Sequence, residues 1–413
     1  MKALGFPRIL IPPARLLGCL ALGAVVFSAC QPAKKGEGRA HDPVGEDPAT
    51  RQVVVLTWAD YIVPDLLTEF HKQTGIKVVY ETIKSSGQFE AELQSRPGAY
   101  DVIICDDNSL MDLIRLGLVE QINREELRNF PNLDPIFLNR DFDPGNRFTV
   151  PYLWGTYAVA YRKDLVSEEP EHSWNLLWDD RLRGHITLID EPIDLLNIAL
   201  RSLGTRPEVA GTPQFEAASA RLVRQITEDR AEMKELYEGI HALTEGRTSV
   251  LVTFSGDAVN SLRENDKIGI FVPKEGSPLW LDSFAVCRNS TRMADAHRFI
   301  DFMLSAHAAG ETTNFLKTAT PNLVAKEEVK PELARDEILY PDADLLSRCG
   351  FTRFEGDRRT LMDRGLRPFY DALREKQSRT RQADEPPPRA DGEKAGLAPV
   401  ARPPVAAASS RIE

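Results

Sequence analysis

Aromatic and acidic residues occur together at several places in this sequence, and residues 279–286, LWLDSFAV, are the most informative of these places. The composition is that of a buried strand, in which side chains two positions apart share a face, so Trp280 and Asp282 are predicted to be neighbours. A carboxylate within an apolar strand costs free energy unless it is paired. We therefore interpret Asp282 as a cation-binding residue beside an indole; the alternative is a structural pair with a neighbouring strand.

Further candidates stand at the ends of predicted strands or in the loops that follow them. The complete set of candidate ligand-binding residues is Trp58, Asp60, Tyr61, Asp106, Glu191, Asp194, Phe254, Asp257, Trp280 and Asp282. Simpler roles exist for several of them. Asp60 and Asp194 could cap the helices that follow them. Trp58 and Phe254 could be core residues, and Asp257 could be a turn residue.

This combination of residue types fits one kind of ligand. A protonated amine forms charge-assisted hydrogen bonds with carboxylates, and aromatic faces both attract cations and cover hydrocarbon. An aliphatic polyamine alternates charged nitrogens with methylene groups, so separated carboxylates with aromatic walls match it along its length. The net charge of -11 agrees with a cationic ligand and argues against a nucleic-acid partner.

Motifs for catalysis are missing from the sequence. The phosphate loop GxxxxGKS/T, the zinc motif HExxH and the nucleophile motif GxSxG do not occur. The seven histidines lack the spacing of metal ligands. We therefore expect a binding protein without cofactor or metal, rather than an enzyme.

The elements that must position these residues alternate between strand and helix. Strands are predicted at residues 53–58, 76–82, 101–105, 152–165, 185–190, 249–256, 268–273 and 279–286, and helices at 64–75, 89–96, 111–119, 195–204, 214–235 and 294–305. Such alternation predicts an α/β fold with largely parallel sheets. We expect two α/β lobes, 53–152 with 279–325 and 153–278 with 326–375. Extended crossings join them, and the ligand cleft lies between them.

Both ends of the chain are predicted to lie outside the folded part. Residues 1–30 are predicted to be a lipoprotein signal peptide, because basic residues precede a short apolar run that ends in FSAC, with Cys30 as the lipid anchor. Plain secretion without lipidation is the alternative. Residues 31–52 are predicted to be a flexible linker and residues 376–413 a disordered tail. Three cysteines remain, an odd number, so free thiols are expected at Cys105, Cys287 and Cys349.

With these residues identified, the sequence resembles the polyamine-binding proteins of bacterial ABC importers, which bind spermidine or putrescine. The resemblance covers about residues 53–355. It is carried by LTWADYIVPDLLTEFHKQTGIKVVYET, NLDPIFLNRDFDPGNRFTVPYLWGTYAVAY, FVPKEGSPLWLDSFAV, ATPNLVAK and LYPDAD. It implies a two-lobed periplasmic-binding-protein fold that closes on its ligand about two hinge crossings. It also implies delivery of the polyamine, outside the cytoplasm, to permease subunits in the membrane. We expect the protein to be a monomer that is held at the membrane by its lipid anchor.

The resemblance also assigns roles by position. It implies cleft aromatics at Trp58, Tyr61 and Trp280, amine-binding carboxylates at Glu191, Asp194 and Asp282, and acidic residues typical of putrescine binders at Asp60 and Asp257. The departures from the family pattern are Phe254 for a Trp, Asp106-Asp107-Asn108 for Ser and a small or aromatic residue, Thr318 for a Tyr, and Thr352 for a Gln. Aromatic surface is lost and negative charge is gained, so the identity of the amine stays open. The alternative functions are a polyamine sensor that acts on a signalling partner, and the binding of another small solute by the same fold.

Overall fold

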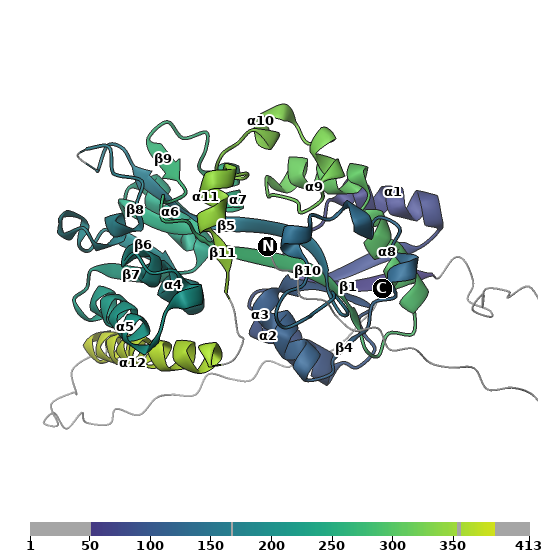
Figure 1. Cartoon of the computed structure of the whole chain (residues 1–413), viewed down its shortest axis with the longest axis horizontal. Coiled ribbons are helices and arrows are strands. Elements are labelled where there is room, and N and C mark those ends of the chain that lie inside the picture. The colour runs from purple at the N-terminus through teal and green to yellow at the C-terminus, as the bar shows by residue number, and fades with distance from the viewer. Residues whose placement is uncertain (1–50, 167, 353–356, 385–413) are drawn as a thin grey trace, which may run out of the picture. The chain divides into compact units, whose positions relative to one another are not determined.

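The computed structural model describes residues 51–166, 168–352 and 357–384, which belong to one compact unit, Asp47–Glu413. Strands and helices alternate along most of this part of the chain (Figure 1). The predicted signal peptide, Cys30 and nearly all of the predicted linker lie outside the described residues. None of the described helices has the length and apolar character needed to cross a bilayer.

The strands form one mixed sheet. Their bounds are β1 (Gln52–Trp58), β2 (Lys77–Ile83), β3 (Val102–Asp106), β4 (Val119–Glu120), β5 (Val150–Arg162), β6 (Ile186–Ile189), β7 (Ala231–Lys234), β8 (Val250–Phe254), β9 (Ile268–Phe271), β10 (Pro278–Cys287) and β11 (Gly350–Phe351). The order across the sheet is β2-β1-β3-β10-β5-β8-β6-β7. In addition, β4 and β11 pair with β10, and β9 pairs with β5.

The helices follow the strands as the sequence predicts for an α/β fold. Their bounds are α1 (Pro64–Thr74), α2 (Gly87–Ser95), α3 (Asp107–Arg115), α4 (Pro192–Ser202), α5 (Thr212–Thr227), α6 (Leu236–Glu245), α7 (Ser255–Ser261), α8 (Met293–Met303), α9 (Ala306–Leu316), α10 (Pro331–Ala334), α11 (Ala343–Arg348) and α12 (Arg358–Asp384).

Two long antiparallel strands, β5 and β10, run through the middle of the sheet (Figure 1). They pair from Leu279 opposite Thr156 to Phe284 opposite Val150. On its other edge, β10 pairs with β3 from Asp282 to Val286. Beyond the overlap with β10, β5 pairs with β8 and β9. We call the side with β1, β2 and β3 the first half, and the side with β6, β7 and β8 the second half.

Each half has buried side chains of its own. The first half packs around residues such as Phe70, Ile104, Phe284 and Phe299, and the second around Trp174, Leu196, Val250 and Phe369. Separate cores support the two-lobe division predicted from the sequence, and that division stays a proposal.

The helix predicted at residues 214–235 is wrong in its last part. α5 ends at Thr227, and Asp229 takes a left-handed conformation with φ 51°. The chain then forms β7, which pairs in parallel with β6, with Ala231 opposite Ile186. The charged sequence favours a helix, but pairing with β6 buries Ala231 and decides for a strand.

The first residues of the predicted tail, 376–384, belong to a helix, and the rest of the predicted tail lies outside the described residues. α12 continues to Asp384, and its side chains form an ion pair between Lys376 and Asp229 at 2.9 Å and an i,i+4 pair between Glu375 and Arg379 at 2.5 Å. These ion pairs stabilise the part of the helix that follows its last buried apolar residues. The cysteine prediction is confirmed, since Cys105, Cys287 and Cys349 are free and buried.

Candidate functional site

Asp282 lies on β10 with its carboxylate against the hydroxyl group of Tyr61. The residue is 7% exposed, and Tyr61 donates a hydrogen bond to its Oδ2. Burial raises the pKa of Asp282 to about 8, with repulsion from Asp106 and Asp107 adding to it and the Tyr61 hydrogen bond opposing it. A carboxyl group in this state is largely neutral at pH 7 and becomes charged when a cation binds beside it.

Asp106 lies directly opposite Asp282 on the adjacent strand. The two residues are register partners on the antiparallel strands β3 and β10, and like charges placed directly opposite on one face repel each other. Asp106 also caps α3, because its Oδ1 accepts from the Ser109 amide at 3.0 Å and its Oδ2 from the Ser109 hydroxyl at 2.7 Å. The cap starts the helix at Asp107, earlier than the predicted residue 111.

Glu191 and Asp194 lie at the start of α4. Asp194 is 9% exposed and accepts hydrogen bonds from the Tyr157 hydroxyl at 2.7 Å and the Thr352 hydroxyl at 3.3 Å. Burial raises the pKa of Asp194 to about 6. Burial, followed by repulsion from Asp194 and Asp106, raises the pKa of Glu191 to about 8. Glu191 holds the N-cap position without a capping bond, so the alternative that Asp194 caps this helix is wrong.

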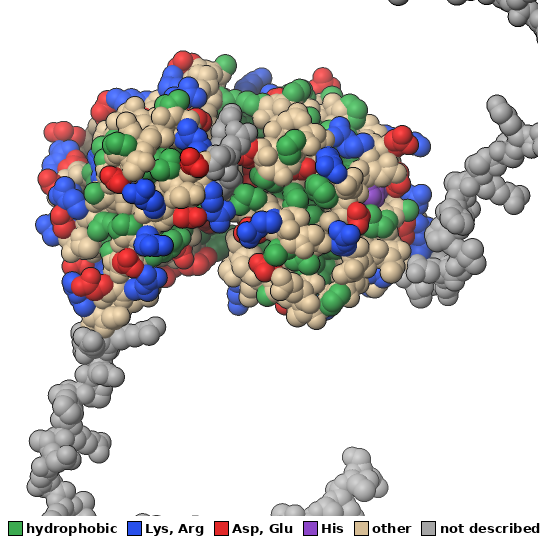
Figure 2. Space-filling model, turned by 60° about the horizontal axis from the view of Figure 1, so that its bottom comes forward, with side chains coloured by type: hydrophobic (Ala, Val, Ile, Leu, Met, Phe, Trp, Pro, Cys, Tyr) green, Lys and Arg blue, Asp and Glu red, His purple; other side chains and the backbone are tan. Residues whose placement is uncertain are grey.

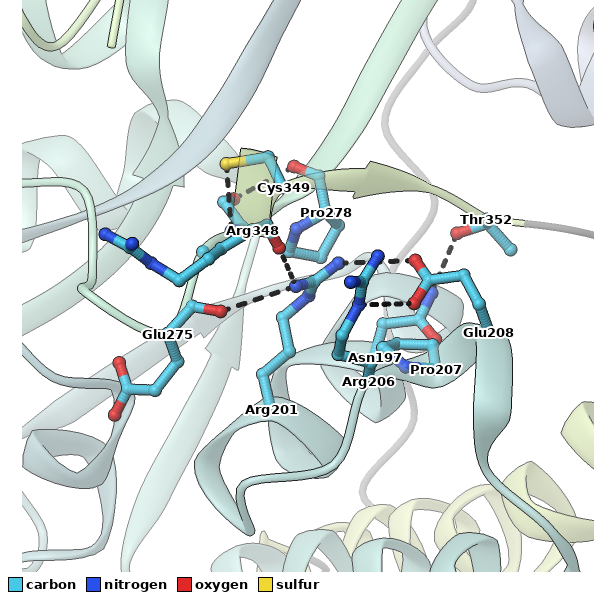
Figure 3. Close-up of polar contacts among 12 residues, drawn as sticks. Asn197, Arg201, Arg206, Pro207, Glu208, Glu275, Pro278, Arg348, Cys349 and Thr352 are labelled. Atoms are coloured by element: carbon cyan, nitrogen blue, oxygen red, sulfur yellow. Dashed lines mark hydrogen bonds and ion pairs between the residues drawn. The ribbon is translucent and has the colours of Figure 1, made fainter. Parts of the chain in front are cut away.

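The segment that carries Thr352 is held by side chains of α4 (Figure 3). The buried Arg201 donates to the carbonyl oxygen of Arg348 at 2.5 Å and lies 3.8 Å from the carboxylate of Glu208. One turn earlier, Asn197 donates from its Nδ2 to the Thr352 hydroxyl at 2.7 Å. α4 therefore carries Asp194 and also holds Thr352, whose hydroxyl group bonds to Asp194.

Asp257 lies on another element than these carboxylates, in the first turn of α7. Burial raises its pKa to about 6, and nearby Glu235 adds to this. Burial, then the charges of Asp257 and Asp60, raise the pKa of Tyr237 on α6. Asp60 is exposed, with φ 55°, and it does not cap α1, whose N-cap residue is Val63.

These carboxylates thus form two groups. We call Asp106, Glu191, Asp194 and Asp282 the Asp282 group, and Asp60, Glu235 and Asp257 the Asp257 group.

Aromatic side chains lie between the two groups. Tyr61 donates to Asp282 and also lies within electrostatic range of Asp257. Trp280, two residues before Asp282, packs edge to face against Phe254 at a centroid distance of 5.9 Å. Phe254 is the N-cap residue of α7, which carries Asp257. The arrangement is therefore acidic at two places and aromatic between them.

The position of Trp280 depends on Gly155, which sequence reasoning missed. Gly155 is the register partner of Trp280 on β5. A Cβ atom at this position would lie 2.6 Å from Cζ2 of Trp280 and 2.8 Å from Oγ of Ser255. The missing side chain lets the indole lie against the backbone, and a glycine inside a predicted strand is the signal that could have indicated it.

One candidate aromatic residue lies in the core instead of the site, and two tyrosines near the carboxylates were not predicted. Trp58 packs edge-on against Phe89 at 5.2 Å on the core of the first half, which favours the core role left open for it. Tyr157 and Tyr237 were not among the candidates, although the structure places Tyr157 on Asp194. Tyr157 lies 37 residues before Asp194, and Tyr237 lies on α6 whereas Asp257 lies on α7, so no local motif connects either tyrosine with these aspartates.

On the face drawn in Figure 2, acidic side chains lie in the recess where the two halves meet. Within the described ranges, no three His, Cys, Asp or Glu side chains are placed to hold a metal ion. The carboxylates are instead spread out, each with a hydrogen-bond donor or an aromatic ring nearby. Such a site can bind an extended organic cation through several separated charges.

Comparison with known proteins adds the following. The model of a family described as bacterial extracellular solute-binding protein matches residues 65–340. The chain is 31% identical over 307 residues to the spermidine/putrescine-binding periplasmic protein of Salmonella typhimurium, which covers 74% of this chain and 88% of that protein. It is also 31% identical over 312 residues to a putrescine/cadaverine-binding protein of Pseudomonas aeruginosa, covering 73% of this chain and 88% of that one.

A solved structure is similar over nearly the whole described part. The substrate-binding protein PotD of a spermidine/putrescine ABC transporter from Streptococcus pneumoniae has a TM-score of 0.71 to this chain at 29% sequence identity. The match covers 79% of this chain and 100% of that one.

Proposed function

Since this chain belongs to the family of bacterial extracellular solute-binding proteins, we propose that it captures a linear polyamine outside the cytoplasm and delivers it to an ABC permease. Its fold is the α/β periplasmic-binding-protein fold expected from the sequence. As a member of a solute-binding family it is not an enzyme, in agreement with the expectation from the sequence.

The observation that carries the choice of ligand is the pair of separated carboxylate groups with aromatic side chains between them. One ammonium group binds beside Asp282, and a second binds beside Asp257. Trp280, Phe254 and Tyr61 cover the methylene chain between the two charges and attract them. A sugar has no charge for these groups, and an amino acid brings a carboxylate that they repel.

The size of the ligand sets how many of these contacts are needed. Small ligands reach at most about 1.5 kcal/mol of binding free energy per non-hydrogen atom, or roughly 9 kcal/mol for a six-atom diamine. Micromolar affinity requires about 8 kcal/mol. A diamine must therefore use both carboxylate groups, and loss of either group has a large effect.

A ligand panel tests the proposal directly. We expect putrescine, cadaverine or spermidine to raise the melting temperature, because a ligand at a hundred times its Kd stabilises the folded state by about 2.7 kcal/mol. Sugars and amino acids at equal concentration serve as controls and leave it unchanged. A shift produced by a sugar or an amino acid, with none from the amines, would overturn the polyamine assignment.

Attachment to the membrane is a separate part of the proposal. The FSAC sequence supports lipidation of Cys30, which would hold the mature protein beside its permease. In a bacterial host, the wild-type protein should fractionate with membranes, and Cys30→Ala should release it or block its processing. Soluble wild-type protein whose N-terminus differs from Cys30 would contradict the anchor without touching the ligand assignment.

A further inference from the structure

On the basis of the polyamine-binding function proposed above, we propose that the guanidinium group of Arg140 is a tethered cation that fills one end of the site. It thereby restricts the ligand to a diamine. Arg140 lies in the segment between Phe137 and β5. It was not among the candidate residues from the sequence.

The contacts of Arg140 are those that a bound amine would make. Its Nε lies 2.8 Å from Oδ2 of Asp107, and its Cζ lies 3.8 Å above the ring of Phe351. Its Nη2 donates to the carbonyl oxygen of Thr352 at 3.3 Å. A carboxylate, an aromatic face and a carbonyl oxygen therefore surround this cation, as they would surround the ammonium group of a ligand.

Arg140 lies next to the Asp282 group through two connections. Asp107 directly follows Asp106, the register partner of Asp282. On the other side, the hydroxyl group of Thr352 bonds to Asp194 at 3.3 Å. The position that Arg140 fills is thus a continuation of the carboxylate cluster, rather than a distant surface contact.

Burial makes this position a potential binding site for a charge. The side chains of Arg140 and Asp107 are 11% and 15% exposed. Oδ1 of Asp107 is buried and has no hydrogen-bond partner in the described part of the chain. Without Arg140, Asp107 would be a carboxylate shielded from water and lacking its counter-charge, which is costly unless another cation takes the place.

The consequence concerns the number of charges on the ligand. The Asp282 group and the Asp257 group accept one ammonium each, and the third acidic and aromatic position is already taken by Arg140. A ligand with two charged nitrogens fits this arrangement, whereas the third ammonium of a triamine meets a guanidinium group and is repelled.

Calorimetry with putrescine and spermidine tests the inference on the full chain. We expect the wild type to prefer putrescine. In Arg140→Ala the ratio of the two affinities should move toward spermidine by roughly tenfold or more, the effect of one charge-assisted hydrogen bond. Arg140→Lys, which keeps a cation near Asp107, should retain the preference of the wild type.

A matched control and a double variant test whether the change in the affinity ratio is specific to Arg140 and to its partner Asp107. Arg124 stacks on Phe130 with its Cζ 3.3 Å from the ring centroid and donates to Gly145 at 3.2 Å, so it makes similar contacts away from the site. Arg124→Ala should leave the affinity ratio unchanged. The gain in spermidine affinity should disappear in Arg140→Ala combined with Asp107→Asn, because the freed carboxylate is then gone.

Several results would overturn the inference. It is wrong if the wild type prefers spermidine, or if Arg140→Ala weakens both amines equally, since a structural role alone gives that result. Should Arg140→Ala not fold, Arg140→Gln provides the same neutral test with a side chain that can still donate to Thr352. Binding of no amine by the wild type would instead refute the proposed function itself.

Discussion

At the scale of single residues, the carboxylate in the apolar strand β10 is explained by its surroundings. Asp282 is buried and accepts a hydrogen bond from the Tyr61 hydroxyl group. It lies opposite Asp106 on the adjacent strand. The described structure places no lysine or arginine ion pair on it. Protonation reduces the free energy cost of burying this carboxyl group, and under the proposed function a bound cation would offset the cost of its charged form.

Replacement of Asp282 by asparagine tests this interpretation. Asp282→Asn keeps the shape and the acceptor for Tyr61 but cannot become charged, so amine affinity should fall by roughly 30-fold or more. The melting temperature of the ligand-free variant at pH 7 should not decrease, because the wild-type group is already largely neutral. Titration calorimetry and melting curves measure the two effects.

The control for this variant is Asp112→Asn, which removes a charge from a partly exposed position of α3 paired with Arg115. It should retain full amine affinity. An Asp282→Asn protein that melts lower yet binds normally would mean that Asp282 has a structural role.

The raised pKa values predict an unusual dependence of stability on pH. Unfolded carboxyl groups have pKa values of about 4, whereas Asp282 and Glu191 have values of about 8 in the folded, ligand-free protein. Between these values the folded state keeps protons that the unfolded state has released. The contribution of these groups is therefore full below about pH 4 and is lost as the pH rises through about 8.

Calorimetric melting from pH 5 to pH 9 measures this dependence against a reference. The wild type should lose stability with rising pH relative to the double variant Asp282→Asn, Glu191→Gln. Amine binding at pH 7 should release protons, seen as a binding enthalpy that changes with the ionisation enthalpy of the buffer. Parallel melting curves and a buffer-independent enthalpy would show that the two groups are ionised in the empty site.

At the scale of elements, β5 and β10 do more than join the two halves. Their antiparallel register sets Gly155 against Trp280, while β3 sets Asp106 against Asp282 on the opposite edge of β10. α4 and α7 then bring carboxylates from the second half to these strands. The site is thus assembled along β10 from elements that are distant in sequence.

The contact at Gly155 can be tested by adding one methyl group. In Gly155→Ala the new Cβ would lie 2.6 Å from Trp280, so the indole must move. We expect a loss of about 1–3 kcal/mol of stability, as in other overpacked sites, together with weaker amine binding. Denaturant melts and calorimetry measure both quantities.

Gly87→Ala provides the comparison. It lies at the start of α2, and a Cβ there meets nothing within 4 Å. It should be neutral or slightly stabilising, by at most about 1 kcal/mol. If Gly155→Ala behaves in the same way, the indole does not depend on this contact.

At the scale of the whole molecule, the two halves have separate buried clusters, and the two long strands that join the halves suggest a hinge. The Asp257 group contains residues of both halves, with Asp60 following β1 and Asp257 following β8. In the empty protein their like charges oppose approach of the halves, and a bound cation removes that repulsion. We therefore infer that an amine draws the two halves together.

Small-angle scattering tests closure. The radius of gyration of the wild type should decrease when putrescine is added at saturation. At a putrescine concentration that saturates the wild type but lies below the Kd of Asp282→Asn, this variant should keep the larger radius, which separates closure from a general effect of the amine. An unchanged radius in wild-type protein shown by calorimetry to be saturated would argue against hinge motion.

The sequence by itself determined much of this protein. Local periodicity was enough for the alternating α/β elements and for the strand around Trp280 and Asp282. The secondary-structure prediction failed where pairing with a segment distant in sequence determines the conformation. β7 is such a case, because it is a strand that pairs with β6. Helix propensity along α5 contains no information about that neighbour.

Only the tertiary structure decided how the candidate residues are grouped. Asp282 and Asp106 are opposed because β10 and β3 pair in one register, and Asp257 joins Asp60 and Glu235 instead. Gly155 contacts Trp280 between paired strands, whereas Arg140 contacts Asp107 from a loop, and no sequence motif marks either contact. Register and packing between distant segments are collective properties of the fold, and they determine which charges repel, which are shielded and which are already paired.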